Sequence, residues 1–128
     1  MLRIVAALCA VVLVCGACEG SNLFVGEVSE EPPRITQILA PSSVTVPAQF
    51  NVDITGTARS GVSTIEVIFS GAFVNADTVN FPGTAETETA RATLDLQQTA
   101  DSLLIIRAVV EDVTGRVSAP AFDTVRVQ

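Results

Sequence analysis

The side chains that usually carry out acid–base and nucleophilic catalysis are scarce in this sequence. It contains no His, Tyr or Trp, and all seven basic residues are Arg. Ser60, Ser63 and Ser70 lie near glycines, but a serine nucleophile needs a neighbouring base to accept its proton, and the usual bases are missing. Serines beside glycines are typical of turns. We therefore predict that the protein is not an enzyme.

Acidic residues offer a second route to a chemical site. Glu111 and Asp112 are adjacent, and Asp53 or Asp123 could approach them in the fold and offer oxygen ligands to Ca²⁺. Their spacing does not match an EF-hand loop, and the simpler alternative is a turn aspartate beside an exposed glutamate. Zinc and haem sites depend on His or Cys ligands. We predict no metal site and no cofactor, with calcium near Asp112 as the open alternative.

The aromatic residues are all phenylalanines, six in number. Sugar-binding sandwiches commonly present exposed Trp or Tyr, which this chain lacks. Phe73-Val74 and Phe81 fall in an irregular stretch from Gly71 to Gly83. There they either cap an open end of the core or form a partner patch. We favour the cap, because a small domain needs most of its apolar side chains for its core.

The charge balance excludes one class of partner. The formal net charge is −7 at pH 7. Nucleic-acid binding depends on clustered basic residues that neutralise phosphates. We therefore expect no nucleic-acid partner.

The first 17 residues have the order of an export signal. Arg3 provides a short positive region, Ile4 to Val14 is continuously apolar, and Cys15-Gly16-Ala17 supplies small residues at a cleavage site. A transmembrane helix is the rival interpretation. Residues 4–17 as a helix would span about 21 Å, against a hydrocarbon core of about 30 Å. We predict that residues 1–17 are a signal peptide.

The segment Val14-Cys15-Gly16-Ala17-Cys18 resembles the lipobox of bacterial lipoproteins, with Cys15 where Leu is usual. The resemblance implies a diacylglycerol group on the Cys18 thiol and cleavage before Cys18. It also implies the outer rather than the inner membrane, because Glu19 follows instead of Asp. The alternative is an ordinary signal peptide cut after Ala17.

Residues 18–34 have the composition of a flexible tether. Glycines and polar residues alternate with acidic residues, and the segment ends near Pro32-Pro33. Leu23, Phe24 and Val25 interrupt it, and either the membrane or the domain could receive them. A mature chain would keep Cys18 alone, so no internal disulfide is expected and the domain, residues 35–128, must depend on its core.

From residue 35 onward, apolar and polar residues alternate in short runs between Pro, Gly and Asn. Period-2 alternation indicates strands with one buried and one wet face. The expected strands are Ile35–Leu39, Val44–Val46, Phe50–Ile54, Ile65–Phe69, Ala90–Leu96, Leu104–Val110 and Asp123–Val127. About seven strands in so short a domain predict an all-β, two-sheet antiparallel sandwich.

One motif supports a more specific assignment. The alternating run Leu104 to Val110, with Asp112, Gly115 and Ser118 after it, resembles the penultimate strand and hairpin of bacterial immunoglobulin-like domains, with fibronectin-III-like variants included. In this turn Asp112 is expected to hydrogen-bond the backbone and Gly115 to supply a positive φ. Antibody-type domains are excluded, because the buried Trp, the Cys pair and the tyrosine corner are absent.

Together these features predict a non-catalytic immunoglobulin-like module, monomeric and lipid-anchored in the bacterial cell envelope. It would present loops or a sheet edge to an envelope or extracellular protein, for interaction or adhesion. The alternative function is a calcium-dependent glycan-binding or small-ligand-binding lipoprotein. No motif in the sequence identifies the partner.

Overall fold

The computed structural model describes residues 31–97 and 101–128, which form one compact unit from Glu31 to Gln128. The predicted signal peptide, Cys18 and the tether up to residue 30 lie outside the described residues. Within the described ranges, no helix is long and apolar enough to cross a membrane.

Eight strands make up the regular structure of the described residues. They are β1 (Arg34–Leu39), β2 (Ser43–Val44), β3 (Ala48–Thr57), β4 (Val62–Gly71), β5 (Asn75–Asn80), β6 (Thr87–Leu96), β7 (Ser102–Asp112) and β8 (Ala121–Val127).

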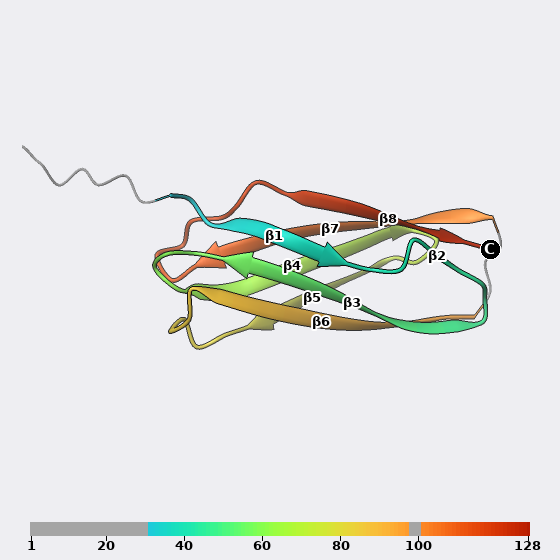
Figure 1. Ribbon diagram of the computed structural model, residues 1–128, viewed down its shortest axis with the longest axis horizontal. Coiled ribbons are helices and arrows are strands. Elements are labelled where there is room, and N and C mark those ends of the chain that lie inside the picture. The colour runs from blue at the N-terminus through green and yellow to red at the C-terminus, as the bar shows by residue number, and fades with distance from the viewer. Residues whose placement is uncertain (1–30, 98–100) are drawn as a thin grey trace, which may run out of the picture. The chain divides into compact units, whose positions relative to one another are not determined.

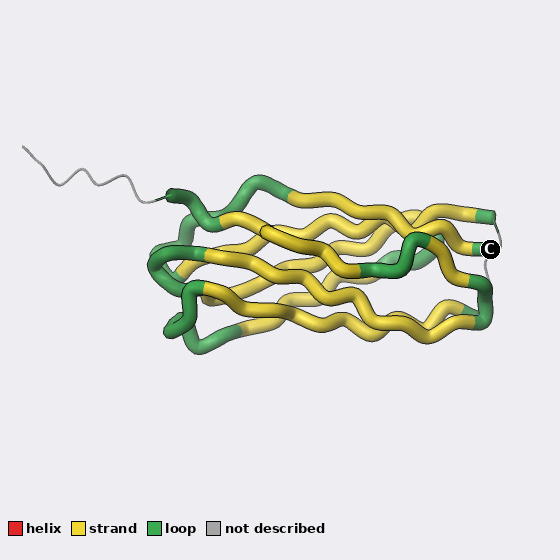
Figure 2. Tube along the Cα trace, viewed as in Figure 1, coloured by secondary structure: helices red, strands yellow, loops and turns green. Residues whose placement is uncertain are grey.

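The strands form two sheets that face each other (Figure 1). The first sheet has three strands in the order β1-β3-β6, and the second has five in the order β2-β8-β7-β4-β5. All pairings are antiparallel except the short parallel contact between β2 and β8. Figure 2 shows the strands running between two ends where the loops gather.

The core lies between the sheets because alternate side chains of each long strand point inward. In β7, Leu104, Ile106 and Val110 are fully buried, whereas Leu103 and Ile105 on the other face are exposed. Burying each such aliphatic side chain contributes about 1.5–3 kcal/mol relative to leaving it in water. The two-sheet β-sandwich predicted from the alternation is confirmed.

One strand, β5, is absent from the sequence prediction, which treated residues 71–83 as irregular. β5 forms the outer edge of the five-stranded sheet and, within the part of the chain that the structure describes, pairs only with β4, from Asn75 opposite Phe69 to Asn80 opposite Thr64. All its residues except the half-buried Val79 are exposed, so no apolar alternation marks it. The strand is defined by hydrogen bonding to its neighbour, which composition does not reveal.

Candidate functional site

Asp112, at the end of β7, is one of two buried polar residues among those described and is only 1% exposed. Its Oδ1 accepts hydrogen bonds from the backbone N–H groups of Thr114 and Arg116, both at 2.9 Å, and from the Thr114 hydroxyl at 2.6 Å. Its Oδ2 accepts one from Arg116 Nε at 2.9 Å. The carboxylate therefore organises the turn between β7 and β8.

These contacts determine the ionisation of Asp112. Burial raises the pKa of this carboxyl, but the hydrogen bonds from Thr114 and Arg116 favour the ionised form, and the net effect holds the pKa well below its usual range. The Ser60 hydroxyl adds a smaller effect in the same direction, although its Oγ reaches no partner with hydrogen-bond geometry. A carboxylate this acidic is a poor base at neutral pH, so Asp112 cannot activate Ser60.

Gly115 lies within the same turn. Its φ is +89°, in the left-handed region that side-chain-bearing residues rarely adopt, and its N–H donates to the Asp112 carbonyl at 3.0 Å. A Cβ built at this position would meet no atom within 4 Å. The requirement for glycine is therefore conformational and not steric.

The acidic residues considered for calcium are not brought together. Glu111 lies on the opposite face of β7 from the buried Asp112. Asp53 lies on the three-stranded sheet and binds Arg91, and Asp123 on β8 pairs with a β7 residue six positions before Asp112. No group of three or more His, Cys, Asp or Glu residues suited to a metal occurs in residues 31–97 and 101–128.

The structure also separates the residues of the candidate partner patch. Phe73 is half-buried, with its ring centroid 6.1 Å from that of Phe69, whereas Phe81 is half-buried beside Ser63 at the other end of the β4–β5 hairpin. Val74 is 81% exposed. The two phenylalanines pack against the core, and the three side chains do not form one continuous surface.

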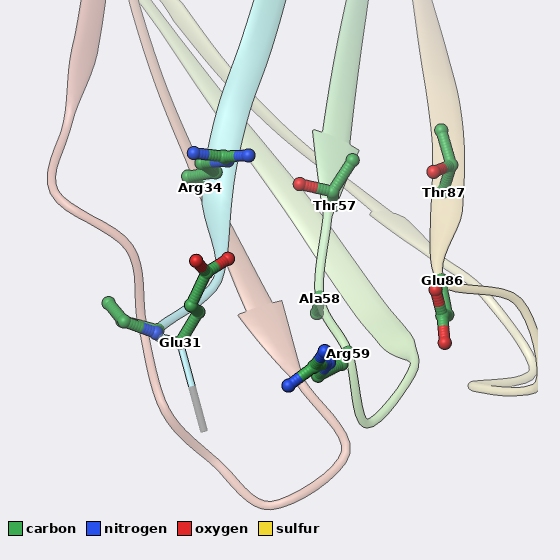
Figure 3. Close-up of a pocket in the computed structure, with 8 residues that line it drawn as sticks. Glu31, Arg34, Thr57, Ala58, Arg59, Glu86 and Thr87 are labelled. Atoms are coloured by element: carbon green, nitrogen blue, oxygen red, sulfur yellow. The ribbon is translucent and has the colours of Figure 1, made fainter. Parts of the chain in front are cut away.

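A shallow surface hollow of about 220 Å³ lies where β1 begins, β3 ends and β6 begins (Figure 3). Its lining residues are Glu31, Pro32, Arg34, Thr57, Ala58, Arg59, Glu86 and Thr87.

A row of side chains across the three-stranded sheet forms one wall of the hollow. Arg34 pairs with Thr57, and Thr57 pairs with Thr87. Figure 3 shows Arg59 reaching toward the space next to Glu31, where exposed charges of both signs meet. No sequence pattern marks this hollow, because only strand register brings residues 34, 57 and 87 together. Its charged lining residues are exposed to solvent and none is buried, which suits a contact surface better than a reaction site.

The outer face of the three-stranded sheet is polar and internally hydrogen-bonded. Arg91 binds Asp53 through two hydrogen bonds of 2.7 and 2.9 Å, and Thr93 donates to Asn51 at 2.8 Å. The hydrogen bond from Arg91 lowers the pKa of Asp53 against a smaller opposing effect of burial, and Asp53 in turn raises the pKa of Arg91. These cross-strand pairs link the exposed faces of β3 and β6 and are consistent with their register.

The outer face of the five-stranded sheet is more apolar. Leu103 is 53% exposed, Phe122 is 62% exposed, and Ile105 lies on the same face. Arg107 lies 4.0 Å from Glu66 on this face. The two outer faces therefore differ in chemistry.

Comparison with known proteins bears on the fold. No family model and no curated protein matches the chain. The PKD domain of an M14-like peptidase from a Thermoplasmatales archaeon is similar, with a TM-score of 0.60 and 15% identity over 77% of this chain and 98% of that chain. The CARDB domain of a Pyrococcus furiosus protein, solved with di-metal ions, has a TM-score of 0.51 and 17% identity over 84% of this chain and 100% of that chain. Both are immunoglobulin-like domains. The fold is immunoglobulin-like.

The immunoglobulin-like assignment made from the β7 motif is therefore confirmed at the level of fold. The motif's last residue, Ser118, is buried, and its Oγ accepts a hydrogen bond from the Val110 N–H at 3.0 Å, which ties the chain after the turn back to β7. Sequence identities of 15–17% establish the fold alone. Function must be argued from the residues of this immunoglobulin-like domain.

Proposed function

We propose that this chain is a non-catalytic immunoglobulin-like module, tethered by lipid to the bacterial cell envelope, that presents a loop or a sheet edge to a protein partner. The observation that carries the proposal is the state of Asp112. This buried carboxylate is used entirely to hold its own turn, and its low pKa makes it unsuitable as a base.

The remaining surface supports a binding role. The hollow beside Arg34 is open and charged, and the outer face near Phe122 carries exposed apolar side chains. Three edge strands of six residues or more, β1, β5 and β6, have no further neighbouring strand among the described residues. Protein interfaces combine such polar and apolar surface. At such an interface, the loss of one contact would lower the affinity for the partner, and no catalytic step would be affected.

The tethering half of the proposal rests on the sequence. Cys18 follows the small residues Gly16-Ala17, and the first described residue of the domain, Glu31, comes 13 positions later. Each buried methylene of an attached acyl chain contributes about 0.8 kcal/mol to membrane affinity, so two or three chains make attachment effectively permanent. The outer membrane is the proposed destination.

The Cys18→Ser variant tests the tether. We expect it to block lipid attachment and the processing that depends on it, which leaves a precursor with an uncleaved signal peptide. Replacing residues 1–18 by an ordinary secretion signal should instead release a soluble, folded domain. Membrane fractionation and mass spectrometry of the wild-type chain provide the readout. A mature mass equal to unmodified residues 18–128 would eliminate the lipid anchor.

A further inference from the structure

β6 has the longest uninterrupted free edge in the described part of the chain. Among the other edge strands, β1 is broken by a bulge between Ile35 and Gln37, β2 has two residues and β5 has six. β6 has ten residues, an unbroken register with β3, and neither Pro nor Gly. Figure 1 shows β6 at the rim of its sheet. Such an edge is a template for pairing with another strand.

The direction of the β6 backbone groups follows from one hydrogen bond. The Ala58 N–H donates to the Glu86 carbonyl at 2.8 Å, and these two residues continue the β3–β6 register, so they form a hydrogen-bonded pair. Hydrogen-bonded and non-hydrogen-bonded pairs alternate along an antiparallel ladder. Even-numbered residues of β6 therefore bond to β3, and odd-numbered residues direct their N–H and C=O groups outward. The outward residues are Thr87, Thr89, Arg91, Thr93 and Asp95.

The same reasoning gives β5 a shorter free edge. The Phe81 N–H donates to the Ser63 carbonyl at 2.8 Å and continues the β4–β5 register, so only Ala76, Thr78 and Asn80 face outward. β6 therefore offers the longer ladder to a partner strand.

The side chains on the β6 edge carry opposite charges on either side of Thr93. Arg91 uses Nε and Nη2 to bind Asp53, which leaves Nη1 to donate elsewhere. Asp95 accepts a hydrogen bond from Gln97 at Oδ1, which leaves Oδ2 as an acceptor. Both charged side chains lie on the outer face of the sheet, two positions from Thr93.

We propose that β6 pairs antiparallel with β6 of a second copy of this chain, about a two-fold axis at Thr93. This pairing brings Arg91 of each copy opposite Asp95 of the other, and the outward N–H and C=O groups of both strands bond across the seam. On the inner face, Ala92 lies opposite Leu94 and Ala90 opposite Leu96, so the apolar layer continues from one copy into the next. The result is a six-stranded sheet, β1-β3-β6-β6-β3-β1.

Only a two-fold axis at Thr93 places Arg91 of one copy directly opposite Asp95 of the other, so the charges favour this register. A two-fold axis at Arg91 would place two guanidinium groups opposite each other, and one at Asp95 would oppose two carboxylates; directly opposed like charges destabilise a ladder. An axis at Thr89 would leave the second half of β6 unpaired. This inference deepens the proposed interaction role and rests on it, and it replaces the monomer expected from the sequence with a dimer.

Cysteine crosslinking of the full chain in intact bacterial cells tests the register. At the axis, the two Cα atoms of residue 93 would lie about 5.5 Å apart, within the range that a disulfide bridges. The two copies of residue 89 would lie about 26 Å apart at the strand rise of about 3.3 Å per residue. We expect Thr93→Cys to give an oxidised dimer and Thr89→Cys, on the same edge and face, to give none above the wild-type background.

Charge-reversal variants provide a second test of the β6 pairing register. Adding Asp95→Arg to the Thr93→Cys variant should reduce the yield of crosslinked dimer at least fivefold, because Arg91 of one copy then faces an arginine at position 95 of the other. Adding Arg91→Asp to Thr93→Cys should reduce the yield likewise, because two carboxylates then face each other. Co-expression of the two differently tagged double variants restores both opposite-charge pairs and should restore the crosslinked heterodimer. Asp95 is exposed, and protease resistance of each variant confirms that it is folded.

Absence of a crosslink in folded Thr93→Cys would overturn the proposal. So would equal crosslinking at positions 89 and 93, or a failure of co-expression to restore the dimer. The proposed lipid anchor and the proposed β6 dimer can be disproved independently. The mass of the mature chain reports whether lipid is attached, and crosslinking reports whether the β6 strands pair in this register.

Discussion

Asp112 links the end of β7 to the turn that follows, and its removal should be costly. Asp112→Ala leaves the Thr114 and Arg116 donors without their buried acceptor, and we expect a loss of about 2–4 kcal/mol in the free energy of unfolding. Asp112→Asn keeps one acceptor oxygen and should lose less. Urea unfolding of both variants provides the measurement. An Ala variant within about 0.5 kcal/mol of wild type would contradict this role.

The same carboxylate should make stability depend on acid. Its folded-state pKa is depressed, so its contribution is fully present above the unfolded-state value of about 3.9 and is lost as pH falls from there toward the folded-state pKa. Wild-type stability should therefore fall below about pH 4. The Asp112→Asn variant should show a shallower decline in unfolding free energy over that window.

Substitutions at Gly115 test the cost of its positive φ alone, because an added side chain would not clash with its surroundings. Since a Cβ there meets nothing, Gly115→Val should lose about 1–3 kcal/mol through backbone strain alone. Gly115→Asn, which tolerates the left-handed region, should lose less. Gly61→Ala should be more damaging than Gly115→Ala, because its Cβ would lie 2.1 Å from the Gly83 carbonyl oxygen. Thermal unfolding of the set orders them, and a stabilised Gly115→Val would refute the turn geometry.

At the scale of the element, β7 provides a direct test of strand phase. Ile106 is fully buried and Arg107, its neighbour, has a side chain that is 39% exposed. Ile106→Asp should unfold the domain, because a buried unpaired charge costs several kcal/mol. Arg107→Gln should change the unfolding free energy by no more than about 0.5 kcal/mol. Circular dichroism and urea unfolding distinguish them, and similar effects would mean that the faces are reversed.

The strands that could be predicted from the sequence are those that bury one face and expose the other. Strands such as β7 alternate between core and solvent, so their sequence carries a period of two, and each of the seven expected strands coincides with or overlaps a strand of the structure. β5 has one half-buried residue, Val79, and therefore no signal. The hollow beside Arg34 and the pair of Arg91 with Asp53 depend on register between distant strands. Register is set by the packing of whole sheets, which a single sequence does not display.

At the scale of the whole molecule, the two sheets present different surfaces to a partner. The three-stranded sheet is polar on its outer face and has the long free edge of β6, whereas the five-stranded sheet exposes Leu103 and Phe122. Pairing through β6 leaves that apolar face free in both copies. An assembly of this kind would present two identical apolar faces, one from the five-stranded sheet of each copy, which suits a partner with repeated binding sites.

Calcium binding distinguishes the proposed module from the alternative ligand-binding lipoprotein. A ligand that binds only the folded state stabilises it by about 2.7 kcal/mol at a hundredfold excess over its Kd, which raises the Tm of a small domain by roughly 10 °C or more. Because Glu111, Asp53 and Asp123 are not grouped with Asp112, we expect millimolar Ca²⁺ to leave the Tm unchanged relative to a chelator. Magnesium at equal ionic strength is the control. A rise of several degrees with Ca²⁺ alone would favour the calcium-dependent alternative over the proposed module.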